Sequence, residues 1–282
     1  MDNFEHCAAL VREADRDRYL AALFAAAEHR AALLSLYAFN VEISRVRELA
    51  REPLPGEIRL QWWREALAGG REGEAVAHPV AAALRETLAH YGLAADRLIG
   101  LIDAHVFDLY DEPMATVTDL EIYGIKTQSA LLGMAADILG GGGAAAELLI
   151  LDAGIAITIA GVLQGLGRHA ARRQLFLPLD LLNRHRAERN EVFAGQASDA
   201  LRGVLGDLCM RARKHLAAAQ DKLESVAPEI LPALLPAALV GPSLERMERP
   251  DYKPLDAQPI APWRRQWLLW RAARNPSRIF AA

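Results

Sequence analysis

The sequence contains few cysteines and no marked excess of charge of either sign. Cys7 and Cys209 are the only cysteines among 282 residues, and two cysteines so far apart form neither a disulfide framework nor a zinc site. The formal net charge is −4, so no overall basic charge favours a nucleic-acid partner. These absences argue against a disulfide-stabilised secreted domain and against nucleic-acid binding, and they favour a reducing, cytoplasmic compartment.

We also find no sequence pattern typical of a targeting or membrane-spanning segment. The N-terminal residues 1–17 contain no basic stretch followed by an apolar one, so no signal peptide is expected. The most apolar window, residues 148–166, contains Asp152, and an acid in the middle of a membrane span is costly. We therefore expect this window to be a buried core helix, and we expect no transmembrane helix.

Alternation of apolar and polar residues, the mark of a half-buried strand, is absent as well. Apolar residues instead recur at helical spacing in nearly every segment, for example over residues 28–50. No linker is long enough to separate domains. The pattern predicts one all-α domain over residues 1–282, built as a helical bundle around a central cavity.

Two stretches each contain a pair of candidate site residues that are four positions apart. The first is LYAFNVEISRVRE, residues 36–48, which contains Ser44 and Glu48. The second is residues 156–182, in which an apolar helix carrying Gly165 and His169 runs into a basic loop and an LPLDLL segment. Side chains four residues apart on a helix share one face, so each pair is a candidate for a common site.

These stretches resemble the two aspartate-rich motifs of the squalene/phytoene synthase family. Residues 37–39 match the family's YAF wording, and the resemblance continues in order through RLQWWRE, HPVAAAL and the helix around Tyr123. It implies an isoprenoid-synthase-type fold. It also implies that four aspartates, which hold magnesium and a prenyl diphosphate in the family, correspond here to Ser44, Glu48, Gly165 and His169.

The chemistry of that diphosphate and metal site is therefore expected to be vestigial. Magnesium prefers carboxylate and phosphate oxygens, and Glu48 is the one carboxylate left at the four positions. We assign no catalytic residue, no metal ligand and no cofactor, with Mg²⁺ required only if the protein is a working prenyltransferase. Alternatively, Glu48 is a surface acid paired with Arg45 or Arg51, and His169 is an exposed residue at a helix end.

Arginines lie near the same positions and suggest a different charge for the site. Arginine binds phosphate oxygens in bidentate fashion without a metal. The candidate anion-binding residues are Arg45, Arg47, Arg168, Arg172 and Arg173. The candidate cavity-lining residues are Tyr37, Asn40, Tyr123 and Gln164. Alternatively, the arginines are solvated or paired with Glu42, Glu48 and Asp180.

Two segments are similar to one branch of the family. They are AFNVE, residues 38–42, and Gln164-Gly165-Leu166 followed by Arg172-Arg173. That branch is the mitochondrial complex I assembly factor with a phytoene-synthase-like domain. The resemblance implies a non-catalytic assembly or accessory factor with a protein partner, for a respiratory complex. Two alternatives stay open, namely a magnesium-dependent prenyltransferase making squalene or phytoene, and an isoprenoid or lipid carrier.

The last expected helix, residues 262–274, contains Trp263, Trp267 and Trp270. It is also rich in arginine and contains no acid. We expect the tryptophans to pack as the closing helix of the bundle, so that truncating each one costs about 3–5 kcal/mol. The alternative is an interfacial helix that holds a cytoplasmic protein at the surface of the inner membrane.

Overall fold

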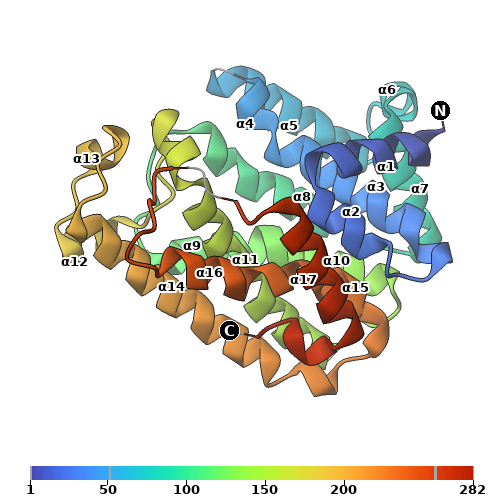
Figure 1. The fold of residues 1–282 in the computed structure, drawn as a ribbon. Helices are drawn as coiled ribbons and strands as arrows, with labels where there is room; N and C mark the ends of the chain where they lie inside the picture. The colour runs from blue at the N-terminus through green and yellow to red at the C-terminus, as the bar shows by residue number, and fades with distance from the viewer. Residues whose placement is uncertain (1, 51, 257–258, 282) are drawn as a thin grey trace. The chain divides into compact units, whose positions relative to one another are not determined.

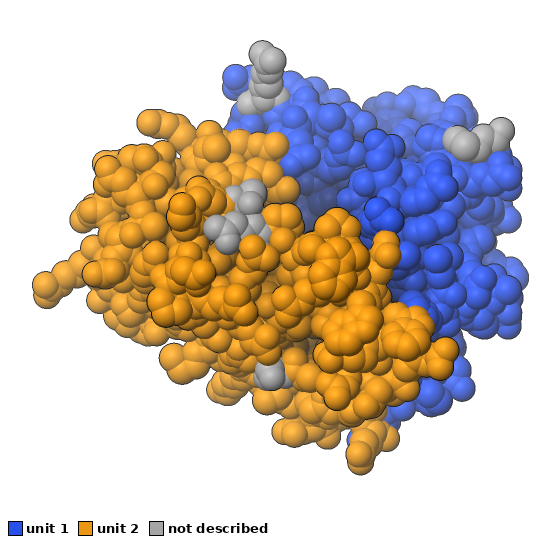
Figure 2. All heavy atoms as spheres, viewed as in Figure 1, with its two compact units in different colours: residues 1–110, 130–147, 225–235 blue, residues 111–129, 148–224, 236–282 orange. Residues whose placement is uncertain are grey.

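The computed structural model describes residues 2–50, 52–256 and 259–281. Within these ranges the chain forms α-helices, 3₁₀ and π segments and loops, and no strand (Figure 1). Contacts divide the chain into two compact units, coloured in Figure 2. Unit 1 comprises residues 1–110, 130–147 and 225–235, and unit 2 comprises residues 111–129, 148–224 and 236–282. The single domain over residues 1–282 stays a prediction.

Unit 1 is built around α3, which is buried on all sides from residue 32 to residue 41. A helix that is apolar all round belongs in a core, and α1 and α7 both contact α3. Trp63 is almost fully buried and meets the Phe39 ring edge-on at 5.2 Å between centroids. The helices of unit 1 are α1 (Asn3–Ala14), α2 (Arg16–Ala22), α3 (Ala27–Ser44), α4 (Val46–Leu49), α5 (Pro53–Leu67), α6 (Glu72–Ala77), α7 (Pro79–Tyr91), α8 (Asp96–His105), η1 (Val106–Leu109), α10 (Ala130–Ile138), η4 (Pro228–Ile230) and α15 (Leu231–Leu234).

Unit 2 contains most of α11 (Ala144–Ala171), which begins in the sequence of unit 1. The π-helix η2 (Ile125–Ser129) follows α9 and lies against α11, where the Ser129 hydroxyl donates to the Leu151 carbonyl at 3.1 Å. Gly154 allows this approach, because a Cβ there would collide with the Ser129 backbone. The other elements of unit 2 are α9 (Val117–Gly124), α12 (Leu179–His185), α13 (Arg189–Phe193), α14 (Asp199–Gln220), η3 (Leu223–Ser225), η5 (Leu235–Leu239), α16 (Val240–Met247), α17 (Pro262–Arg274) and η6 (Pro276–Arg278), with η3 and η5 at the borders of the unit.

The long helix α11 contains the apolar window that the sequence assigns to the core. Among the described residues it is the one helix long and apolar enough to cross a membrane by length and composition. Within its most apolar 18-residue window, 67% is buried inside the protein. That burial fits a core helix.

The tryptophans of α17 do not pack in the core, so the expectation that these side chains are buried is wrong. Trp263 is 71% exposed, and Trp267 and Trp270 are each 47% exposed. At 3.6 residues per turn these three positions form one stripe, and the opposite stripe is the apolar one that packs inward. The buried residues of α17 are Leu268, Leu269 and Ala272.

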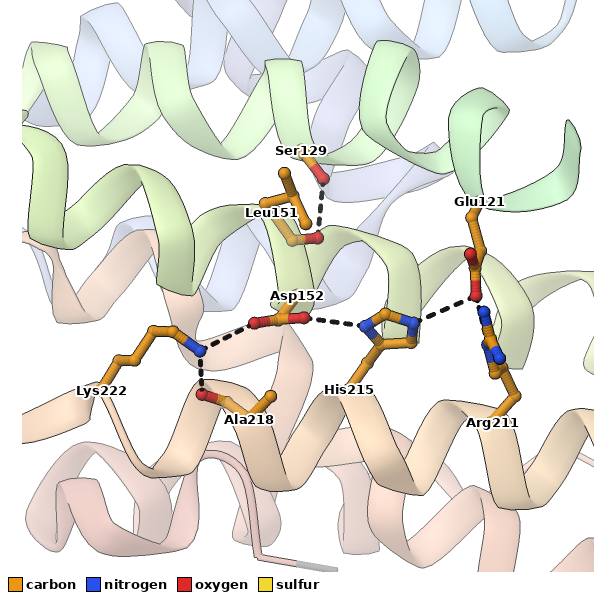
Figure 3. A network of polar contacts seen from close by, with 8 residues as sticks. All are labelled: Glu121, Ser129, Leu151, Asp152, Arg211, His215, Ala218 and Lys222. Carbon is orange, nitrogen blue, oxygen red and sulfur yellow. Dashed lines mark hydrogen bonds and ion pairs between the residues drawn. The ribbon is translucent and has the colours of Figure 1, made fainter. Parts of the chain in front are cut away.

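A polar network joins α9, α11 and α14 inside unit 2 (Figure 3). His215 lies between two carboxylates, with Nδ1 2.8 Å from Asp152 Oδ1 and Nε2 3.2 Å from Glu121 Oε1. Arg211 donates to the same Glu121 oxygen, and Lys222 Nζ donates to Asp152 Oδ2 at 3.0 Å. The acid inside the apolar window is therefore contacted by two residues of the segment formed by α14 and its C-terminal end.

The network predicts an acid-sensitive stability. Burial alone would raise the pKa of Glu121, but hydrogen bonds from Arg211 and His215 outweigh it, so the pKa lies below its ordinary value of 4.5. Such a carboxylate contributes stability that is complete above its unfolded pKa and is lost as pH falls through its folded pKa. We expect Glu121→Gln to lower the unfolding free energy at pH 7 by about 1–3 kcal/mol, with the difference shrinking below pH 4.5.

Urea unfolding between pH 3 and pH 7 measures this effect. Glu224→Gln, at an exposed glutamate of the same unit, is the matched control and should follow the wild type throughout. A Glu121→Gln protein whose stability changes with pH as the wild type does would contradict the assignment.

Candidate functional site

The first vestigial pair lies in unit 1, where the expected continuous helix over residues 28–50 is interrupted. Helix α3 ends at Ser44 and α4 begins at Val46. Ser44 is exposed and its hydroxyl donates to the Val41 carbonyl at 3.3 Å. Glu48 is also exposed, and its carboxylate lies 3.8 Å from Arg45 Nε. The one remaining carboxylate therefore faces a guanidinium.

The second vestigial pair lies in unit 2 on α11. A Cβ at Gly165 would lie 2.8 Å from His169 Nε2, so the imidazole occupies the space beside the glycine. The His169 ring also packs against the Phe176 ring, with 4.7 Å between the two centroids. The Tyr123 ring lies near the same Phe176 ring, with 6.4 Å between their centroids. An aromatic cluster thus stands where the resemblance implies a pair of aspartates.

The part of the chain that the structure describes contains no group of three or more histidine, cysteine, aspartate or glutamate side chains placed to hold a metal ion. Ser44 and Glu48 belong to unit 1, whereas Gly165 and His169 belong to unit 2. That the two pairs face each other across one cavity stays a prediction.

Two of the expected cavity-lining residues are buried within unit 1. Tyr37 is almost fully buried, and the Arg18 guanidinium lies 5.8 Å from the centre of its ring. Burial raises the pKa of Tyr37, which keeps the phenol protonated. Asn40 is also buried, one helical turn further along α3. Their cavity-lining role stays a prediction.

Unit 2 contains a cavity of about 420 Å³ between α11, α16, α17 and the segment that joins α16 to α17. From α11 it is lined by Gln164, Gly165 and Arg168, all of which the sequence singles out. Arg172 and Arg173 are exposed beyond this stretch, and Arg173 has the positive φ of a helix end. The cavity thus contains part of the second motif.

The other walls of the cavity add residues that the sequence motifs do not identify. Arg246 and Arg265 line it from α16 and α17, together with Ser243 and Tyr252. Burial raises the pKa of the Tyr252 phenol, which therefore remains a hydrogen-bond donor at neutral pH. Three guanidinium groups with hydroxyl and amide donors form a setting suited to a phosphate or carboxylate group. Arg246 and Tyr252 lie outside every motif, and no spacing signal marks them.

The expected arginines of unit 1 make local contacts. Arg45 pairs with Glu48, as in the alternative interpretation of the sequence, whereas Arg51 lies outside the described residues. Arg47 Nη1 donates to the Ala50 carbonyl at 3.4 Å. Glu42 pairs with Arg59 at 3.4 Å. Anion binding by Arg45 and Arg47 stays a prediction.

Two glycines of α11 that line the cavity should respond in opposite directions, in unfolding free energy, to substitution by alanine. A Cβ at Gly167 would collide with the backbone carbonyl of Leu255, whereas a Cβ at Gly161 meets nothing within 4 Å. We expect Gly167→Ala to lower the unfolding free energy by about 1–3 kcal/mol, because backbone must shift. Gly161→Ala should instead raise it by about 0.5–1 kcal/mol through helix propensity. Equal effects in denaturant unfolding would show that the Leu255 segment does not rest on α11.

Comparison with known proteins agrees with this geometry. A profile of the squalene/phytoene synthase family matches residues 11–271. The NADH dehydrogenase (ubiquinone) complex I assembly factor 6 of Rattus norvegicus is 29% identical over 251 residues, covering 89% of this chain and 75% of that protein. The Homo sapiens protein of the same name is 28% identical over 247 residues, covering 88% and 74%.

A crystal structure of a dehydrosqualene synthase in complex with ligand has a TM-score of 0.79 at 16% identity, covering 96% of this chain and 95% of that chain. This likeness confirms the expected all-α, isoprenoid-synthase-type fold. The match over residues 11–271 extends across both compact units. With the fold and the two motif positions in place, the chain belongs to the squalene/phytoene synthase family.

Proposed function

We propose that this protein is a catalytically degenerate member of its family that acts as an assembly or accessory factor for a respiratory complex. The observation that carries the proposal is the loss of carboxylates at Ser44, Gly165 and His169. Relatives whose names describe assembly of complex I match most of the chain. They support a role in bringing proteins together.

The charges at the vestigial positions support the loss of prenyl transfer. Enzymes lower reaction barriers by at least about 8 kcal/mol, and a metal that neutralises the leaving diphosphate supplies a large part of this in metal-dependent transfer. Here Glu48 already faces Arg45, whose positive charge opposes a cation. The His169 imidazole fills the space beside Gly165. We propose no cofactor, and Mg²⁺ enters only with the prenyltransferase alternative.

The arginine-lined cavity of unit 2 favours a second candidate function. Arg168, Arg246 and Arg265 surround a volume of about 420 Å³, and guanidinium groups bind phosphate oxygens without a metal. A carrier of an isoprenoid or lipid with a phosphate group fits this chemistry. In that case the ligand travels with the protein and appears in a native mass spectrum.

The experiment is incubation with farnesyl and geranylgeranyl diphosphate in Mg²⁺, followed by product analysis. We expect no squalene, dehydrosqualene or phytoene, while an active squalene synthase in parallel gives product. In cells lacking the gene, we expect less assembled respiratory complex, restored equally by the wild type and by Glu48→Ala.

A prenyl product that disappears in Glu48→Ala would establish the prenyltransferase alternative instead. Unchanged levels of every respiratory complex in the deletion strain would remove the assembly role. A phosphate-bearing lipid that co-purifies with the wild type, and is lost in Arg168→Ala, would favour the carrier.

A further inference from the structure

Helix α17 presents an aromatic stripe outward from unit 2. Trp263, Trp267 and Trp270 are each about half exposed or more, and they are three of the five tryptophans of the chain. Large apolar side chains at the surface of a protein mark a site of contact when they gather on one face. Because the opposite stripe of α17 packs inward, the helix is fixed in the orientation that shows the tryptophans.

Arginine side chains lie over the same stripe. The Arg271 guanidinium stacks on the Trp267 ring at 4.4 Å from its centroid, and that of Arg274 stacks on Trp270 at 5.1 Å. Stacking holds the charges beside the rings, so the face offers apolar surface and positive charge together. An arginine can then extend along the ring toward a polar layer while the indole enters an apolar one.

The charge of this part of the chain has one sign. Residues 259–282 contain five arginines and no acid, although the chain as a whole carries −4. Arg264 lines a small pocket with Glu245 and Asp251. The positive charge on the stripe itself, from Arg271 and Arg274, is held over the tryptophan rings.

We propose that the outer face of α17 docks on a bilayer of anionic phospholipid. Indole rings favour the boundary between acyl chains and headgroups, and arginine beside them contacts lipid phosphate. The inference is independent of the proposed assembly role, since it rests on α17 and not on the vestigial positions.

The charge and shape of the face favour a lipid surface over a protein partner. A protein that buries three tryptophans needs matching pockets for each, whereas a bilayer accepts any projecting ring. A second copy of this chain would bring the same positive charge against Arg271 and Arg274, which costs energy. An anionic bilayer satisfies the rings and the charges at once.

The experiment is flotation with vesicles of phosphatidylcholine, with and without phosphatidylglycerol, at low and at raised salt. We expect the wild type to bind the anionic vesicles and to release at raised salt. Trp263→Ala/Trp267→Ala/Trp270→Ala should weaken binding by at least about tenfold, because affinity scales with buried apolar area. Arg271→Gln/Arg274→Gln, which removes the two charges stacked on the stripe, should weaken it by about fivefold for each charge.

Two matched control variants change exposed residues of unit 2 that lie outside α17. Ile122→Ala/Leu148→Ala/Met210→Ala removes exposed apolar side chains, and Arg184→Gln/Arg189→Gln removes two exposed charges. Both should bind as the wild type does. Quenching of wild-type tryptophan fluorescence by bromine-labelled acyl chains adds a readout that needs no variant.

Several outcomes would overturn the proposal. They are equal binding of neutral and anionic vesicles, equal weakening by the control variants, and wild-type fluorescence that brominated lipid does not quench. Wild-type protein that ignores vesicles but forms a dimer, or captures an acidic peptide, through the tryptophans would assign the face to a protein instead.

Discussion

Asp152 lies in α11, the one described helix that is long and apolar enough to cross a membrane by length and composition, and the organisation of unit 2 depends on polar partners for its carboxylate. An unpaired buried carboxylate costs several kcal/mol. The segment of α14 and its C-terminal end brings His215 and Lys222 to Asp152, and α9 brings Glu121 to the other side of the imidazole. One histidine thereby links three helices. The same helix α11 then carries Gln164 and Arg168 to the cavity near its C-terminal end.

The fold and the proposed loss of metal chemistry depend on different residues. A metal site depends on a few carboxylates, whereas the fold depends on many buried apolar contacts. At Gly165, where the resemblance implies an aspartate, the His169 ring fills the space beside the glycine, with Phe176 as its packing partner. The two positions thus contribute packing within an unbroken helix. Arginines also line the neighbouring cavity, and guanidinium groups can bind phosphate oxygens without a metal.

Much of the fold could be predicted from helical periodicity, because burial of apolar faces decides where helices form. The α17 bounds, residues 262–274, are those expected, since Pro262 opens the helix at a position where its missing N–H costs nothing. The break after Ser44 and the π-helix at residues 125–129 could not be predicted. Both are local departures inside apolar segments, where tertiary contacts such as Gly154 against Ser129 decide the backbone.

The candidate site was only partly visible in the sequence. Gln164 and Arg168 lie in a recognisable motif, but Arg246 and Tyr252 reach the cavity through chain folding alone. The sequence pattern of α17 predicts buried tryptophans, and that prediction is wrong. A stripe of aromatic residues fits a buried face and a docking face equally well, and the choice depended on Leu268 and Leu269, which compete for the inward position.

The central claim is that Ser44, Glu48, Gly165 and His169 do not bind magnesium with a diphosphate. Calorimetric titration of the protein with a non-hydrolysable diphosphate, in Mg²⁺ and in chelator, measures this directly. The expected result is heat of binding that is the same in both conditions, or none in either. Tight binding that requires Mg²⁺ and disappears in Glu48→Ala would contradict the claim.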